Sequence, residues 1–220
     1  MLDILIDYLY IIPAALIAIM LHEIAHGLVS YWLGDPTPKR QGRLSLNPAK
    51  HLDPIGTICL IFFHVGWAKP VMVNPEYYKN KKWGMALVAL AGPVINFILS
   101  FVSIFIFGLI IKLTYTMSNL PMALEILLNF FQYLAIINLG LGIFNLIPIP
   151  PLDGSKILGA FLSDKAYDMY MKIQRYGFFI LAGFLILSSL YGSGISFVSV
   201  LVEKIYYFFL RITFIIFGLV

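Results

Sequence analysis

Long apolar runs set the strongest limit on what this chain can fold into. One of them, residues 84–111, contains no charged side chain at all. A helix that crosses a bilayer needs roughly 20 mostly apolar residues. Five stretches reach or approach that length: 4–33, 84–111, 125–147, 173–191 and 195–220. We therefore expect an all-α, polytopic membrane protein with five long transmembrane helices.

The composition supports the same interpretation. Hydrophobic residues make up 60% of the chain and charged residues 12%, whereas soluble domains carry about 25% charged residues. Asp3 and Asp7 stand where a signal peptide would carry Lys or Arg, so the first run is expected to be a retained helix. No internal repeat or soluble segment is visible, and we expect one membrane domain over residues 1–220.

Shorter segments lie between the long runs. Residues 54–65 form an apolar run of about 12 residues, too short to cross as a straight helix, and they favour a re-entrant segment enclosed by protein. Apolar and polar residues alternate in 40–48 and 66–75, which predicts two short strands and a small sheet or hairpin. Its edge would suit pairing with an extended peptide. Irregular loops are the alternative.

Basic residues orient the chain in the membrane. If residues 54–65 enter the bilayer and return, twelve of the 15 Lys and Arg side chains share one face: Lys39, Arg40, Arg43, Lys50, Lys69, Lys79, Lys81, Lys82, Lys156, Lys165, Lys172 and Arg175. Positive loops remain cytosolic. We therefore predict a multi-pass protein of the plasma membrane with this face toward the cytosol. The same rule accounts for the net charge, so we expect the lipid bilayer as a partner and no nucleic acid or nucleotide.

Three ionisable side chains lie close together in the second half of the first apolar run. Residues 22–26 read HEIAH, the pattern H-E-x-x-H. On a helix His22 and His26 face the same way, one turn apart, and can bind one metal ion. Glu23 beside them is placed to accept a proton from water that the metal activates. Ionisable groups inside a membrane are costly and usually functional. A structural polar cluster is the alternative.

A catalytic zinc site takes three protein ligands, and Asp153 is the best candidate for the third. It lies in FNLIPIPPLDG, residues 144–154, after the third long run. The prolines interrupt helical hydrogen bonding and Gly154 allows a tight turn, so the carboxylate can turn back toward the first helix. The alternative is that Asp153 only caps the following helix.

Five motifs occur together in the order HEIAHG, GRLSLNPAKHLDPIGT, GWAKPVMVNP, AGPVIN and NLIPIPPLDG. Together they resemble the site-2 protease family of intramembrane zinc metalloproteases, over roughly residues 15–160. The resemblance implies one Zn²⁺ bound by His22, His26 and Asp153, with Glu23 as general base. It also implies a membrane-anchored protein substrate, cleaved near the cytosolic face in regulated intramembrane proteolysis.

The match extends to less certain positions. Asn145 corresponds to an amide of the family's pattern that could donate to the oxyanion of a tetrahedral intermediate; a helix-packing hydrogen bond is the alternative. The AGPVIN motif is expected to bring two helices close together. His51 and His64 are expected to have structural roles. The chain resembles the minimal members, which lack PDZ and CBS domains, and two C-terminal helices over about 173–220 follow its catalytic core.

Two other function classes stay open. One is a catalytically silent, metal-binding membrane protein, against which the presence of both Glu23 and Asp153 counts. The other is an ion transporter that uses the intramembrane histidines and acids. Secondary transporters are commonly built from inverted repeats, and no such symmetry is visible in this sequence.

Overall fold

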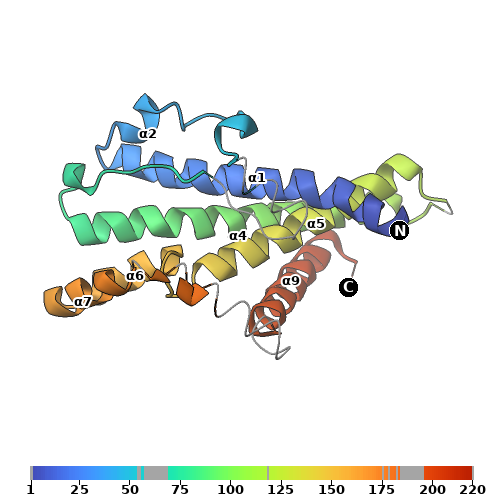
Figure 1. The fold of residues 1–220 in the computed structure, drawn as a ribbon. Coiled ribbons are helices and arrows are strands. Elements are labelled where there is room, and N and C mark those ends of the chain that lie inside the picture. Colours follow the sequence, from blue (N-terminus) through green and yellow to red (C-terminus); the bar gives the residue numbers. More distant parts are fainter. Residues whose placement is uncertain are drawn as a thin grey trace.

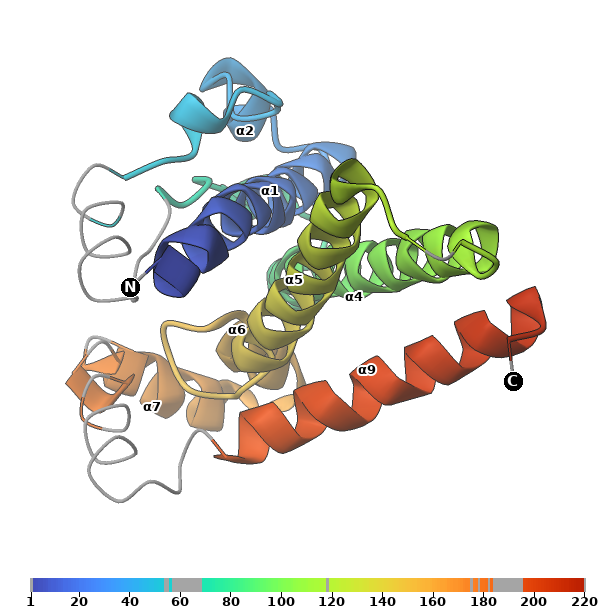
Figure 2. The same cartoon turned by 90° about the vertical axis from the view of Figure 1, so that its right-hand side faces the viewer.

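A computed structural model describes residues 2–53, 56, 69–117, 119–174, 176–177, 179–181, 183 and 196–219. Three long helices form its centre: α1 (Leu2–Trp32), α4 (Lys81–Thr114) and α5 (Met122–Asn145). The shorter elements are α2 (Thr37–Arg40), the 3₁₀ helices η1 (Pro48–Lys50) and η2 (Pro75–Tyr77), α6 (Asp153–Phe161), α7 (Asp164–Gln174) and α9 (Ser196–Phe217). Figure 1 shows α1 and α4 side by side, with α2 over one side and α6 and α7 over the other. Figure 2 shows that α9 runs at an angle to α5.

Small side chains fill the contacts among the three central helices. The helix α4 packs against α1, α5, α6 and α9, and the residues buried on α1, α4 and α5 include Ala14, Ala18, Ala89, Gly92, Ala135 and Gly142. Helices that lie in lipid gain little from hydrophobic association, so close packing of small residues holds them together. This close approach lets polar side chains on different helices reach one another.

The all-α class is confirmed, but the prediction of five long transmembrane helices is not supported. Among the described residues three helices are long and apolar enough to span a bilayer: Asp7–Trp32, Lys81–Thr114 and Met122–Asn145. Residues 195–220 do contain a helix, α9, but Glu203, Lys204 and Arg211 interrupt its apolar sequence. The predicted helix over 173–191 lies mostly outside the described residues, and so does the re-entrant segment 54–65.

The predicted sheet or hairpin is also not supported, because the described parts of 40–48 and 66–75 contain no strand. Lys69 N–H donates to the His51 carbonyl over 2.9 Å, but other backbone groups of these segments bond to side chains. Val71 N–H donates to Glu23 over 2.8 Å, and Asn74 N–H donates to Asp35 over 2.7 Å. In the other segment, Asn47 caps η1. Side chains of this kind compete with ladder formation, so alternation in the sequence alone predicts too much sheet.

Candidate metal centre

The imidazoles of His22 and His26 lie one turn apart on the same side of α1, as their spacing requires. Both are buried, and their ring centroids are 4.5 Å apart. Nδ1 of His22 donates to Oδ1 of Asn96 over 2.5 Å, and Nδ1 of His26 donates to the carbonyl of Val88 over 2.6 Å. Each ring therefore carries its hydrogen on Nδ1, which leaves the Nε2 lone pair to face the centre of the site.

The amide of Asn96 connects three helices at this point. It lies on α4, accepts from His22 of α1, and donates over 2.7 Å to Oδ1 of Asn138 on α5. Asn138 in turn donates to the Leu134 carbonyl of its own helix. Both amide side chains are fully buried. This chain of hydrogen bonds fixes the orientation of the His22 ring from the far side of the bundle.

Asp153 reaches the two histidines from a different part of the chain. It is the first residue of α6, and Oδ2 of its carboxylate lies 3.1 Å from Nε2 of His22 and 3.1 Å from Nε2 of His26. A Cβ on Gly154 would collide with the carbonyl of Leu146. The start of α6 therefore packs directly on the turn that follows α5, and α6 packs against α4; these contacts place the carboxylate at the imidazoles. Helix capping, the alternative for Asp153, is not what its side chain does.

The charge of Asp153 follows from its neighbours. Burial alone would raise the pKa of this carboxyl, but a proton or other cation shared with the two imidazoles, together with the ammonium of Lys156, outweighs burial and holds the pKa below its usual value. The ammonium of Lys156 lies 3.4 Å from Oδ1, the oxygen that does not face the histidines. Asp153 is thus an anion with one oxygen directed at the centre of the site.

A zinc ion fits these three ligands. Three ligand atoms at about 2.0–2.1 Å from a tetrahedral zinc are separated from one another by roughly 3.3 Å. The structure gives 3.1 Å for two of these separations, and all three ligand atoms lie within 4.8 Å of one another. Two imidazole lone pairs and a carboxylate oxygen repel one another at such distances unless a cation lies between them. The donor set and its hydrogen-bonded tautomers therefore suit a divalent metal.

Gly92 on α4 makes room for both imidazole rings. A Cβ at this position would lie 2.5 Å from Cε1 of His22 and 2.6 Å from Cε1 of His26. Any other residue here would push the rings away from their present positions. Close approach of α4 to the metal-binding helix was the expectation for the AGPVIN motif, and the structure shows that approach at Gly92 itself.

Glu23 lies next to His22 in sequence, and its carboxylate reaches the connection between α1 and α4. Its Oε2 accepts from the backbone N–H of Val71 over 2.8 Å. Gly27, one turn further along, is buried against the same connection, since a Cβ there would lie 2.8 Å from Cδ2 of Leu44. The polar connection between α1 and α4 therefore covers the face of α1 that carries Glu23.

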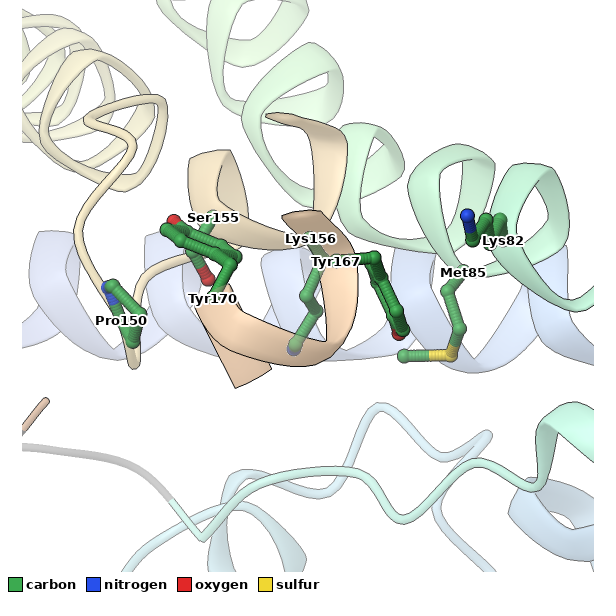
Figure 3. A pocket seen from close by; sticks show the side chains of 7 residues that line it. All are labelled: Lys82, Met85, Pro150, Ser155, Lys156, Tyr167 and Tyr170. Atoms are coloured by element: carbon green, nitrogen blue, oxygen red, sulfur yellow. The ribbon is translucent and has the colours of Figure 1, made fainter. Parts of the chain in front are cut away.

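A small cavity lies beside α6, on the side of Lys156 (Figure 3). Its volume is about 70 Å³, and it is lined by Lys82, Met85, Pro150, Ser155, Lys156, Tyr167 and Tyr170. By this measure one water needs at least about 10–15 Å³, so the cavity has room for a few water molecules. Its lining includes Lys156, the residue that contacts Asp153, but not Asp153 itself.

Asn145 and His51, two other residues considered in the sequence analysis, make hydrogen bonds outside the His22–His26–Asp153 cluster. Nδ2 of Asn145 donates to the Leu141 carbonyl of its own helix over 3.0 Å, so its role toward a substrate stays a prediction. His51 is buried and donates from Nε2 to the Ser45 carbonyl over 2.7 Å, as a structural role requires. His64 lies outside the described residues.

Some contributors to the centre were not identified as such from the sequence. The carbonyl of Val88 accepts from His26, and Asn138 accepts from Asn96, the amide that holds His22. An amide inside an apolar helix is a usable signal, because such groups are costly in a membrane unless they are paired. Asn138 carries that signal in the sequence, whereas a backbone carbonyl carries none.

The chain matches the family model described as "Peptidase family M50" over residues 10–188. It is 39% identical over 171 residues to "Putative zinc metalloprotease YwhC" of Bacillus subtilis, which covers 78% of this chain and 77% of the relative. It is 25% identical over 187 residues to "Putative zinc metalloprotease Rip2" of Mycolicibacterium smegmatis, covering 83% of this chain and 69% of the relative. No solved structure matches the chain significantly.

The family match spans most of the chain and includes all three residues of the candidate metal centre. The relatives are named "putative zinc metalloprotease", and the donor set suits zinc. The resemblance inferred from the motifs is therefore confirmed: the chain belongs to peptidase family M50, the site-2 protease family.

Proposed function

We propose that this chain is an intramembrane zinc metalloprotease that hydrolyses peptide bonds of membrane-anchored proteins near the cytosolic face. The observation that carries the proposal is the convergence of His22, His26 and Asp153 within 4.8 Å, with Glu23 next to the first ligand. This is the residue set of a metalloprotease, with two histidines and a base on one helix. Membership of the family supports the same activity.

The roles of the residues follow from their positions. His22, His26 and Asp153 would hold the zinc ion, which acts as a Lewis acid on the peptide carbonyl and lowers the pKa of water. Glu23 would accept the proton as water attacks and then return it to the leaving amine. The Val71 amide holds Oε2 of Glu23, and we assign the proton transfer to Oε1.

Asn145 is the proposed donor to the oxyanion. Its amide lies at the last residue of α5, eight positions before Asp153. In the structure Nδ2 is bonded to Leu141 within the same helix. To act on a substrate the side chain would have to exchange this bond for one to the oxyanion, which a change of rotamer permits because Asn145 is partly exposed.

The depth of the site supports cleavage near one membrane surface. His26 lies six residues before the end of α1 at Trp32, which corresponds to about 9 Å along a helix. The connection that follows carries basic residues, which favours the cytosolic side. We propose that the protein lies in the plasma membrane as one domain, with its catalytic core in about residues 15–160 and the C-terminal helices completing it. Regulated intramembrane proteolysis is the process that such a site would serve.

The test compares the wild type with Glu23→Gln. Both proteins are purified, their zinc content is measured, and cleavage of a membrane-anchored test protein is followed in proteoliposomes. We expect the variant to retain zinc but to lose cleavage, because the amide cannot accept the proton. Membrane proteomes of cells that express either form would then reveal natural substrates as proteins that accumulate with Glu23→Gln.

A matched control is Glu125→Gln, which changes an exposed glutamate at the start of α5. It should cleave like the wild type. Cleavage by Glu23→Gln at the wild-type rate would reject Glu23 as the base. Zinc binding without cleavage by the wild type, on any membrane-anchored protein, would favour a catalytically silent metal-binding protein. Zinc-independent ion flux in the same proteoliposomes would favour a transporter.

A further inference from the structure

Arg43 is a buried cation whose hydrogen bonds all go to backbone carbonyls in the described part of the chain. Only 6% of it is exposed. Nη1 donates to the carbonyl of Lys50, and Nη2 donates to those of Lys69 over 2.6 Å and Pro70 over 2.8 Å. A buried guanidinium is costly unless its N–H groups are bonded. The structure therefore uses Arg43 to fix the backbone on both sides of residues 51–68.

One of these carbonyls belongs to the peptide group that contacts Glu23. The Pro70 carbonyl and the Val71 N–H form a single planar unit, and in a trans peptide they point in opposite directions. Arg43 bonds the oxygen of this unit, while Oε2 of Glu23 accepts from its nitrogen over 2.8 Å. Two hydrogen bonds thus connect the Arg43 guanidinium to the Glu23 carboxylate through the 70–71 peptide group.

The surrounding contacts keep this peptide group against α1. A Cβ on Gly27 would lie 2.8 Å from Leu44 and 3.4 Å from Cγ1 of Val71, so the connection approaches the helix closely there. At the other end of the segment, the Asn74 N–H donates to the buried carboxylate of Asp35. The segment 69–74 is therefore fixed to its surroundings at each end, and the contact with Glu23 lies between.

We infer that Arg43 is a positioning residue for Glu23 and acts through the 70–71 peptide group. The inference rests on the proposed function, in which Glu23 is the general base. A cation on the carbonyl oxygen polarises the peptide group, which strengthens the hydrogen bond from its N–H to the carboxylate. The flexible Glu23 side chain is thereby held in one orientation next to the metal ligands, and reaction rates depend steeply on such orientation.

The experiment measures the effect of Arg43 on Glu23 in two ways, by the hydrogen bond at Val71 and by the rate of peptide cleavage. Arg43→Gln removes the cation and the forked donor, and Arg43→Lys keeps the charge but not the fork. Arg40→Gln, at an exposed position three residues earlier, is the matched control. Amide hydrogen exchange at Val71, resolved by mass spectrometry with fragmentation, reports the hydrogen bond to Glu23 directly. Zinc content, kcat and KM are measured on the same preparations.

We expect Val71 to exchange at least about tenfold faster in Arg43→Gln than in the wild type, as loss of a charge-assisted hydrogen bond implies. Glu23→Ala should accelerate the same amide similarly, and Arg40→Gln should not. We expect kcat to fall about 10–100-fold with zinc content and KM near wild type, because orientation and not binding is lost. Arg43→Lys should recover part of both effects.

A second variant covers the case in which Arg43→Gln does not fold. Val71→Pro removes the N–H, replaces the side chain by a ring that fixes φ, and leaves Arg43 its three carbonyls. It should lower kcat at least to the same extent. Wild-type exchange at Val71 in folded Arg43→Gln, or undiminished kcat in Val71→Pro, would overturn the inference and leave the protease activity standing. Failure of the proposed function would appear differently, as cleavage unaffected by Glu23→Gln, with the exchange data still reporting the contact.

Discussion

The substitution Gly92→Ala tests the geometry of the metal centre with the smallest possible change. The added methyl group would lie 2.5 Å from Cε1 of His22 and 2.6 Å from its Nε2, and 2.6 Å from Cε1 of His26. Ordinary contact begins at 3.4 Å, so the helix and the rings must separate by about 0.9 Å. Metal sites tolerate errors of only about 0.2 Å in ligand distance. The two rings cannot retreat freely, because Asn96 and Val88 hold their far sides.

The expected loss is at least about 100-fold in zinc affinity, the upper end of the effect of disturbing groups that support metal ligands. At a zinc concentration 1,000 times the wild-type Kd, bound zinc stabilises the folded protein by about 4.1 kcal/mol. A hundredfold weaker site retains only about 1.4 kcal/mol of that stabilisation. The zinc-dependent rise in Tm should therefore shrink to about a third. In the absence of zinc, the helix propensity that Ala gains over Gly, up to about 1 kcal/mol, partly offsets a packing strain of about 1–3 kcal/mol. General unfolding is therefore not the expected outcome.

The assay is a zinc competition with a chromophoric chelator, together with thermal unfolding in detergent with and without zinc. Gly140→Ala is the control, since it makes the same change in another membrane helix where the added Cβ has nothing within 4 Å. It should bind zinc like the wild type. If Gly92→Ala binds zinc within threefold of Gly140→Ala, the close approach of α4 to the imidazoles is not what the metal centre requires.

Two further substitutions test the supports of the site. Asn96→Leu leaves Nδ1 of His22 unpaired and should weaken zinc binding about 10–100-fold in the same competition assay. The control is Ser100→Ala, one turn further along α4, which removes a hydroxyl that has no partner among the described residues. It should leave zinc binding unchanged. Asp35→Asn should destabilise the protein at neutral pH by about 1.5–3 kcal/mol. Burial alone would raise the pKa of Asp35, but hydrogen bonds from Thr37, Asn74 and Ser30 hold it below 3.8. The difference in Tm between wild type and Asp35→Asn should thus be complete above pH 3.8 and shrink as the pH falls further; a difference that persists unchanged in acid would contradict this.

The candidate metal ligands were predictable because the physical signals were local or costly. The helical spacing of His22 and His26 predicts that both imidazoles can bind one metal ion. Ionisable groups in an apolar run are costly to bury, which indicates a functional role. Asp153 required an inference across more than 120 residues, from a proline-rich segment and Gly154. Its alternative, a helix cap, could be set aside only with coordinates, since the local pattern is the same in both cases.

The loops were predicted less well. Alternating residues in 40–48 and 66–75 resemble strands, but a strand needs a partner, and Glu23, Asp35 and Arg43 supply the hydrogen bonds instead. Apolar length also predicted a transmembrane helix at 195–220, where the described helix α9 carries three charged side chains. The hydrophobic pattern of a sequence identifies the segments that are buried in protein or lipid. It does not identify the hydrogen-bond partner of each polar group, because that partner depends on contacts between distant parts of the chain.

The buried amides connect metal binding to the packing of the helices. Inside a membrane no water is present to form hydrogen bonds with an unpaired polar group. Asn96 is therefore expected to stay bonded to His22 on α1 and to Asn138 on α5. The same bonds that hold the imidazole in its metal-binding tautomer therefore hold the three helices in register. Rotation of α1 about its axis would break the hydrogen bond between His22 and Asn96. The first helix can thus present its ligands in only one orientation, which makes the metal centre a property of the bundle and not of the HEIAH segment alone.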